Sequence, residues 1–212
     1  MYAELKSHLE LLPAFHSAEA VYDPGTAEHC SRVGNICAAM SRRLGLAPRD
    51  IEVMTWVGIL HDLGKLGVSE EILQKPGPLT EPEWEEVKRH PTTGSDLILA
   101  ISPSLDLLAT AIRAHHERWD GTGYPDGLAG FDIPLFGRIV AVGDVFDAVT
   151  HRRGYRPGKL THREGVKFVA ERANRHLDPD LVSVFVDLDR QGLITAPACG
   201  DSEVGRSRAR SI

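Results

Sequence analysis

Apolar residues recur at helical spacing along almost the whole chain, and this spacing limits the possible folds more than any other property of the sequence. From Val33 onward, for example, they follow the i, i+3, i+4, i+7 and i+11 pattern of one helix face. Asp23-Pro24, Ser102-Pro103 and Asp178-Pro179 each place a capping residue before a proline that fits the first helical turn. No convincing alternation of period two indicates a β-strand. The sequence therefore predicts an all-α fold.

Two irregular stretches interrupt the expected helices. The longer runs from about Glu117 to Gly137 and is rich in glycine and proline, but its aromatic and large apolar side chains indicate an ordered loop. The shorter runs from Gly64 to Leu79. We see no internal repeat and no linker that would divide the chain. We expect a helical extension over residues 1–17, one domain over 18–196 and a flexible tail over 197–212.

The charge balance excludes some classes of partner. The 212 residues include 30 acidic and 24 basic side chains, a formal net charge of −6. This balance argues against a general nucleic-acid or anionic-membrane binder, so we expect neither a nucleic-acid polymer nor a membrane as partner. The three cysteines form no CxxC pair, which disfavours a disulfide framework or a thiolate zinc site. Without a signal-peptide pattern or an apolar run long enough to span a bilayer, we expect a cytoplasmic protein.

Five of the ten histidines fall on core-facing sides of the expected helices, where the spacing predicts apolar residues. They are His29, His61, His90, His115 and His116. A single core-facing histidine is more often an ordinary hydrogen-bonded residue than a metal ligand, and we interpret the other five histidines in that way. Several histidines converging beside Asp62 are costly to bury unless a partner binds them. A metal ion is such a partner, because neutral imidazoles and carboxylates are its ligands.

The donor atoms of this set indicate which ions would bind. Nitrogen and oxygen ligands without thiolate suit Fe, Mn or Ni, allow Zn, and suit Mg or Ca less because so many are imidazoles. The candidates are too many for one ion that keeps an open position, so we expect two divalent ions with a bridging carboxylate such as Asp62. Two such ions can hold a hydroxide for in-line attack on phosphorus and neutralise the phosphoryl oxygens. The site therefore favours phosphoryl chemistry.

Ordered motifs extend this interpretation: HDLGK (61–65), His90-Pro91, HHERWDGTGYP (115–125), IPLFGRIVAVGDVFDAVT (133–150) and RRGYR (152–156). Together they resemble the HD-GYP domain, a branch of the HD phosphohydrolase superfamily that hydrolyses bacterial cyclic di-GMP. TAEHCSRV (26–33) is similar to the first histidine helix of that family, and the resemblance runs from about Ala18 to Val186. It implies a compact HD-domain helical bundle with a long ordered GYP loop, and it makes 18–196 the catalytic domain.

The resemblance implies a set of metal ligands, matched position by position. They are His29, His61, Asp62, His90, His115, His116 and Asp144. Asp144 enters only through the resemblance, because periodicity alone would leave it as a helix-surface acid. Family members with three metals carry a glutamate four residues before the first histidine, where this chain has Gly25. We therefore expect two metals and hydrolysis of cyclic di-GMP to linear pGpG, with further hydrolysis to GMP left open.

The resemblance also assigns residues to the substrate. Lys65 matches a lysine that contacts the scissile phosphate and helps to protonate the leaving oxygen. With the metal-bridging Asp62 it forms the expected catalytic pair. Asp147, Arg153 and Arg156 match positions that contact substrate. The two arginines suit this role because a guanidinium group can make paired contacts to phosphate.

Gly123, Tyr124 and Pro125 form the GYP of the family name. The residues alone predict a turn, in which glycine supplies freedom in φ and proline stiffens the exit. The resemblance adds diguanylate cyclase domains as partners of this loop. Two other functions stay open: an HD-type phosphohydrolase of another nucleotide, including related cyclic dinucleotides, and a sensor or scaffold that binds a cyclic dinucleotide without turnover. The intact ligand set and Lys65 disfavour the scaffold.

Overall fold

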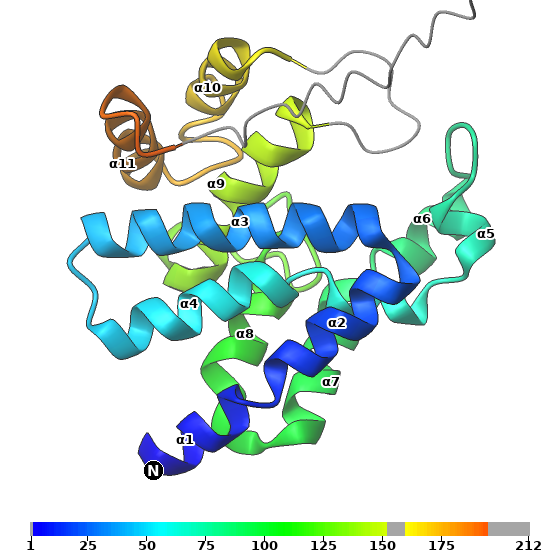
Figure 1. Ribbon diagram of the computed structural model, residues 1–212. Helices are drawn as coiled ribbons and strands as arrows, with labels where there is room; N and C mark the ends of the chain where they lie inside the picture. Colours follow the sequence, from blue (N-terminus) through cyan, green and yellow to red (C-terminus); the bar gives the residue numbers. More distant parts are fainter. Residues whose placement is uncertain (1, 152–159, 195–212) are drawn as a thin grey trace, which may run out of the picture.

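The computed structural model describes residues 2–151 and 160–194, and within these ranges the chain is helical with no β-strand (Figure 1). The predicted all-α fold is confirmed. The α-helices are α1 (Tyr2–Leu9), α2 (Leu12–Tyr22), α3 (Pro24–Arg43), α4 (Pro48–Leu60), α5 (Glu70–Leu73), α6 (Glu81–Val87), α7 (His90–Ile101), α8 (Asp106–Ala114), α9 (Leu135–Thr150), α10 (His162–Ala170) and α11 (Pro179–Arg190). Short 3-10 helices lie between them: η1 (Leu63–Gly67), η2 (Pro103–Leu105) and η3 (Gly130–Asp132).

Capping residues define where the helices that flank α9 begin. Asp23 Oδ1 accepts a hydrogen bond from the backbone N–H of Thr26 at the start of α3, with N and O 3.1 Å apart. Asp178 Oδ1 accepts one from the backbone N–H of Asp180 at the start of α11, at 2.9 Å. These bonds satisfy backbone donors that have no partner inside the helix. These two of the three predicted caps are confirmed, and both helices pack against α9, which carries Asp144.

Two glycines let α3 and α4 pack side by side at very short range (Figure 1). A Cβ added at Gly58 would lie 2.7 Å from Gly34 Cα, and one added at Gly34 would lie 2.6 Å from Ile59 Cγ1. Any larger residue would push the two helices apart. Their close contact brings His29 of α3 and His61 at the end of α4 together, with ring centroids 5.2 Å apart.

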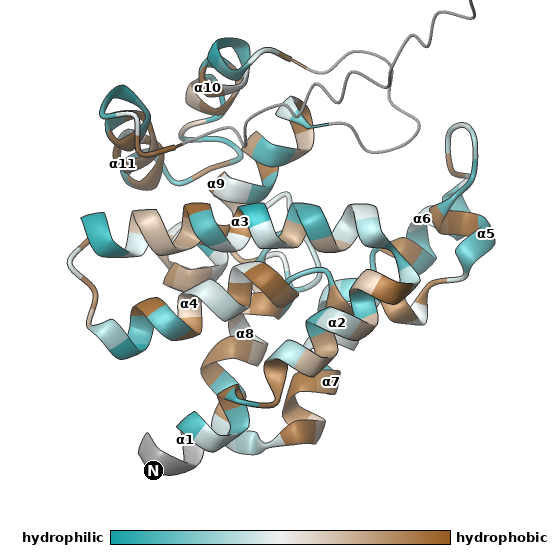
Figure 2. Ribbon diagram, in the orientation of Figure 1, coloured by the Kyte–Doolittle hydropathy of each residue, from teal (hydrophilic) through white to brown (hydrophobic). Residues whose placement is uncertain are grey.

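The hydrophobic core joins these helices to α7, α8, α9 and α11, and Figure 2 shows apolar residues gathered along α7, α8 and α11. Phe146 of α9 and Phe185 of α11 are fully buried there, with ring centroids 5.0 Å apart. None of the helices within 2–151 and 160–194 combines the length and apolarity that a bilayer span needs. The core therefore fixes α9 between α3 and α11, which places Asp144 opposite α3.

Some expected boundaries differ from the structure. The irregular stretch ends earlier than Gly137, because Pro134 is extended (φ −51°, ψ 136°) and α9 begins at Leu135. The expected domain boundary after residue 17 lies inside α2. Leu9 and Leu12 are buried in the same core as α3 and α4, so the N-terminal helices pack as part of this bundle. The expected tail over 197–212 lies outside the described residues.

Candidate metal centre

Five histidines and two aspartates from distant parts of the sequence converge between α3, α4, α7, α8 and α9. They are the predicted ligands His29, His61, Asp62, His90, His115, His116 and Asp144. Helix ends supply most of them: the pair at 61–62 follows α4, His90 begins α7, and the pair at 115–116 follows α8. The remaining two come from within α3 and α9. The structure therefore brings together side chains up to 115 positions apart in one buried centre.

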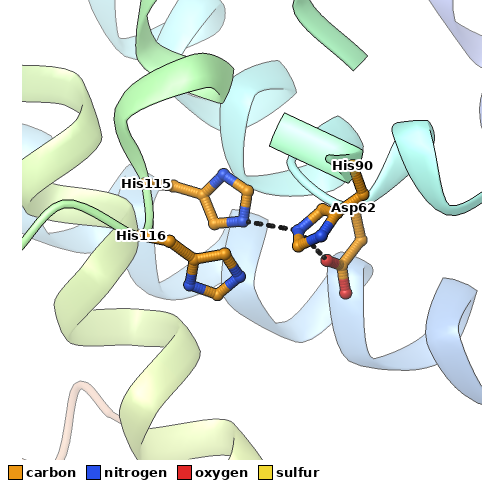
Figure 3. Close-up of side chains that lie close together, drawn as sticks. All are labelled: Asp62, His90, His115 and His116. Carbon is orange, nitrogen blue, oxygen red and sulfur yellow. Dashed lines mark hydrogen bonds and ion pairs between the residues drawn. The ribbon is translucent and has the colours of Figure 1, made fainter. Parts of the chain in front are cut away.

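The first ligand group consists of Asp62, His90, His115 and His116, which Figure 3 shows directed toward one another. One potential ligand atom from each lies within 4.8 Å of the others. His90 Nε2 is 3.2 Å from His115 Nε2 and 3.3 Å from Asp62 Oδ1. These distances match side chains arranged around a shared position.

The protonation of the first group's rings shows what that position requires. His90 Nδ1 donates to the carbonyl of Val87 at 2.7 Å, and His115 Nδ1 donates to the carbonyl of Ile112 at 2.5 Å. A neutral imidazole carries one N–H, so both Nε2 atoms present lone pairs. Two buried lone pairs facing each other repel unless a cation lies between them. This geometry fits a metal ion.

The second ligand group consists of His29, His61 and Asp62, whose potential ligand atoms also lie within 4.8 Å of one another. His29 Nε2 is 3.1 Å from Asp144 Oδ1, which adds a fourth donor. His61 Nδ1 donates to the carbonyl of Gly58 at 2.8 Å, so its Nε2 again presents a lone pair. That Nε2 is buried, and no described residue gives it a hydrogen bond. Asp62 belongs to both groups, which is the arrangement of a bridging carboxylate.

Burial sets the charge of these groups. Desolvation lowers the pKa of His61 to about 4 and that of His90 to about 3, well under the ordinary value, and it also lowers the pKa of His115 and His116. Burial alone would raise the pKa of Asp144, but its close contact with His29 and the nearby histidines hold that pKa well below its ordinary value. Neutral imidazoles beside a charged carboxylate are the forms that bind divalent metals.

Lys65 lies beside the shared carboxylate. It belongs to η1, one turn after Asp62, and its Nζ donates to Asp62 Oδ2 at 2.5 Å. The structure therefore places a cationic group at the edge of both ligand groups, and the predicted contact of Lys65 with the scissile phosphate stays a prediction. Arg153 and Arg156 lie outside the described residues, so their substrate contacts stay predictions.

Asp147 makes contacts that the sequence did not predict. Its carboxylate is buried on α9 and accepts hydrogen bonds from His29 Nδ1 at 2.6 Å and from Arg32 Nε at 2.7 Å. Burial raises its pKa, but these hydrogen bonds outweigh burial and lower it below the ordinary value. Asp147 also lines a cavity of about 130 Å³ with Arg32 and His151. Its predicted contact with substrate stays a prediction, and its observed contact is with His29, a predicted metal ligand.

The GYP loop packs directly against the first ligand group. A Cβ at Gly123 would lie 2.4 Å from Arg118 N and 2.6 Å from His116 O, so this glycine is required by close backbone approach. Freedom in φ, the expected reason, is instead used at Gly121, where φ is 78°. The ring of Tyr124 lies against that of His116, with centroids 4.9 Å apart. The GYP loop therefore packs against the predicted ligand His116.

Glu117 organises this loop, and sequence reasoning missed it. Its side chain is buried, and Oε1 accepts hydrogen bonds from the backbone N–H groups of Asp126 at 2.7 Å and Gly127 at 3.1 Å. Oε2 accepts one from Leu128 at 3.1 Å. The available signal was its place directly after His116, at the start of a loop rich in N–H groups that need acceptors.

The fold and site together define an all-α domain with a buried histidine–aspartate cluster that could hold metal ions. The family model described as "HD domain" matches residues 17–181. The chain belongs to the HD-domain family, and the predicted resemblance is confirmed. Divalent metals are the cofactors of HD-domain phosphohydrolases, which agrees with the donor atoms assembled here.

Curated relatives indicate which branch of the HD-domain family the chain is most similar to. The chain is 36% identical over 183 residues to a cyclic di-GMP phosphodiesterase of Thermotoga maritima, covering 86% of this chain and 50% of the relative. It is 40% identical over 164 residues to a cyclic di-GMP phosphodiesterase of Pseudomonas aeruginosa, covering 77% and 39%. A 3′3′-cGAMP-specific phosphodiesterase of Vibrio cholerae is 36% identical over 163 residues, covering 76% and 31%. The chain thus spans half or less of these relatives.

Solved structures confirm the fold. A cyclic GMP-AMP phosphodiesterase of Vibrio cholerae superposes with a TM-score of 0.68 at 21% identity, covering 88% of this chain and 49% of that one. The HD domain of PgpH from Listeria monocytogenes, solved with cyclic-di-AMP, gives a TM-score of 0.55 at 15% identity, covering 85% and 93%. At these identities the likeness concerns the fold alone.

Proposed function

We propose that this chain is a metal-dependent phosphodiesterase that hydrolyses cyclic di-GMP to linear pGpG. The observation that carries the proposal is the pair of ligand groups that share Asp62, with Lys65 bound to the same carboxylate. Two adjacent cation sites with a nearby ammonium group suit hydrolysis of a phosphodiester. Relatives named cyclic di-GMP phosphodiesterases support the choice of substrate.

The cofactors belong to this proposal. Imidazole and carboxylate donors favour Fe or Mn, with Ni or Zn as alternatives. In such a site, bound divalent cations supply charge neutralisation at the phosphoryl oxygens and activation of water as the nucleophile. Asp62 faces both groups and would bind on both sides, while the Nδ1 hydrogen bonds of His61, His90 and His115 hold their rings with Nε2 directed inward.

Lys65 is the proposed general acid. Its ammonium group lies at the edge of the centre and is held there by Asp62. It would contact the scissile phosphate and donate a proton to the oxygen that leaves, which stabilises charge developing in the transition state. Arg153 and Arg156 are proposed to hold the phosphates.

The names of some relatives support 3′3′-cGAMP as an alternative substrate. Relatives named 3′3′-cGAMP-specific phosphodiesterases match the chain at 36% identity, as the cyclic di-GMP enzyme of Thermotoga maritima does. The alternative function is therefore hydrolysis of the mixed cyclic dinucleotide. Diguanylate cyclase domains as partners of the GYP loop, and a cytoplasmic location, belong to the same proposal.

Anaerobic loading with Mn or Fe, followed by chromatography of the products, tests the proposal. Cyclic di-GMP, 3′3′-cGAMP and bis(p-nitrophenyl) phosphate would be compared as substrates. We expect pGpG from cyclic di-GMP, with the generic diester cleaved far more slowly. Preference for 3′3′-cGAMP would establish the alternative, and binding of cyclic dinucleotide without turnover would contradict both.

A lysine variant separates binding from chemistry. Lys65→Met should abolish most turnover and leave the metal content unchanged, because Lys65 is not a ligand. Lys75→Met is the matched control, since Lys75 also pairs with a carboxylate, that of Glu83, at 2.6 Å but away from the centre. Equal turnover in the two variants would contradict the role of Lys65.

A further inference from the structure

Arg32 is connected to the metal centre through one carboxylate. Its Nε lies 2.7 Å from Asp147 Oδ1, and its Nη2 lies 2.9 Å from Asp147 Oδ2. The same Oδ2 accepts the Nδ1 hydrogen of His29 at 2.6 Å, and His151 Nδ1 lies 2.9 Å from Oδ1. Both carboxylate oxygens of Asp147 therefore have partners, and His29 is one of the partners of Oδ2. We propose that Arg32 is a positioning residue for the metal ligand His29 and acts through Asp147.

Helix periodicity explains why these groups meet. Arg32 follows His29 by three residues on α3, and Asp147 follows Asp144 by three residues on α9. Residues three apart share one helix face. The packing of α3 on α9 therefore places His29 and Arg32 against Asp144 and Asp147. The imidazole of His29 lies between the two aspartates, with Nε2 3.1 Å from Asp144 Oδ1 and Nδ1 2.6 Å from Asp147 Oδ2.

The contact with Asp147 determines which nitrogen of His29 is available. An ionised carboxylate only accepts hydrogen bonds, so Nδ1 must carry the ring proton. Nε2 then presents its lone pair toward the second ligand group. A partner of this kind fixes both the tautomer and the orientation of a metal-binding histidine.

Arg32 is what allows Asp147 to serve in this way. The Asp147 side chain is 1% exposed, and a buried carboxylate without compensation is costly. The planar guanidinium group makes two parallel contacts, which fix the carboxylate in position as well as compensating its charge. Lysine could supply the charge but only one contact. Without the guanidinium group, the carboxylate would rotate or take up another partner, and His29 would lose its fixed orientation.

The test measures metal affinity directly, so it does not depend on the proposed substrate, although the inference rests on the centre being a metal site. Mn²⁺ binding to the full chain would be followed by the electron paramagnetic resonance signal of free Mn²⁺. We expect Arg32→Gln and Asp147→Asn to bind the ion about 10- to 100-fold more weakly than the wild type, the range for loss of a partner behind a ligand. Arg32→Lys should fall between.

Arg138→Gln is the matched control. Arg138 Nη1 contacts Asp178 at 2.5 Å with side-chain exposures of 12% and 2%, similar to the 21% and 1% of the proposed pair, but Asp178 caps α11 and contacts no ligand. A merely structural role for Arg32 would lower stability in both variants without changing Mn²⁺ affinity. The positioning role predicts weaker Mn²⁺ affinity in Arg32→Gln and wild-type affinity in Arg138→Gln.

A double variant tests whether Arg32 acts on His29 through Asp147. If Arg32 acts through Asp147, Arg32→Gln combined with Asp147→Asn should bind Mn²⁺ like Asp147→Asn alone. Wild-type affinity in Arg32→Gln, or additive losses in the double variant, would overturn the inference. Should Arg32→Gln fail to fold, Arg32→Lys decides, since unchanged affinity would also overturn it. A wild type that binds Mn²⁺ but cleaves no cyclic dinucleotide would contradict the proposed function and leave this comparison intact.

Discussion

His90 Nε2 and His115 Nε2 lie 3.2 Å apart in a buried space, and both rings use Nδ1 to donate to backbone carbonyls. Their facing lone pairs repel in the metal-free protein and would both bind a cation placed between them. The same contact therefore destabilises the folded state without metal and stabilises it with metal.

Metal binding should raise thermal stability. Mn²⁺ at about 100 times its dissociation constant should add about 2.7 kcal/mol to the free energy of unfolding, because the unfolded chain lacks the centre. Differential scanning calorimetry with Mn²⁺ and then with excess EDTA measures this shift. His90→Gln, which removes one of the facing lone pairs, should respond less. An unchanged melting temperature under both conditions would contradict the interpretation.

Acid should destabilise the metal-free protein before it protonates the carboxylates. Burial lowers the pKa of His61 to about 4 and that of His90 to about 3. Between about pH 6.5 and these values, the unfolded chain binds protons that the folded chain does not, so the free energy of unfolding decreases as the pH falls. Above pH 6.5 this contribution to stability is fully present.

Urea unfolding in EDTA at a series of pH values measures that decline. His61→Leu, which has one such histidine fewer, should show a shallower slope between pH 6.5 and 4. A wild-type protein that is as stable at pH 5 as at pH 7.5 would contradict the assigned burial and charge.

Gly123→Ala should disrupt the GYP loop. The added Cβ would lie 2.4 Å from Arg118 N and 2.6 Å from His116 O, both backbone atoms that cannot move independently. Strain of this kind costs about 1–3 kcal/mol and would displace Tyr124 from the ring of His116. Gly25→Ala, whose Cβ would meet Asp23 Oδ1 at an ordinary 3.4 Å, is the control. Equal melting temperatures for the two variants would be evidence against this packing.

Gly25→Glu should create a third metal site. Gly25 lies on α3 four residues before His29, on the same helix face, and a side chain there has room. Metal analysis should show three ions per chain in place of two, and chromatography should show more GMP from cyclic di-GMP. Gly25→Gln controls for side-chain size. An unchanged metal content would show that residue 25 does not limit the number of metals.

Local sequence patterns were sufficient to predict the helices and the inward direction of most of the histidines in the cluster. Asp23 and Asp178 cap helices as predicted, because capping depends on residues within one turn. The inward direction of His61 and His115 also follows from helix periodicity, since each continues an apolar face. These features depend on neighbours along the chain, so one sequence is enough to predict them.

Contacts between distant segments could not be predicted from one sequence. His29 and Asp147 are separated by 118 positions, and their hydrogen bond depends on how α3 packs on α9. Periodicity alone left Asp144 on a helix surface, and only the resemblance predicted it to be a ligand. Glu117 was missed for a similar reason, because its partners are backbone N–H groups 9 to 11 residues away.

If two metal ions share Asp62, the metal content of the protein should depend on this one carboxylate. Wild-type protein and Asp62→Ala would be loaded with Mn or Fe without oxygen, desalted and analysed, with Asp106→Ala on the exposed start of α8 as control. We expect two ions per chain in the wild type and the control, and loss of both ions together with turnover in Asp62→Ala. An Asp62→Ala protein that keeps two ions and full turnover would contradict this expectation.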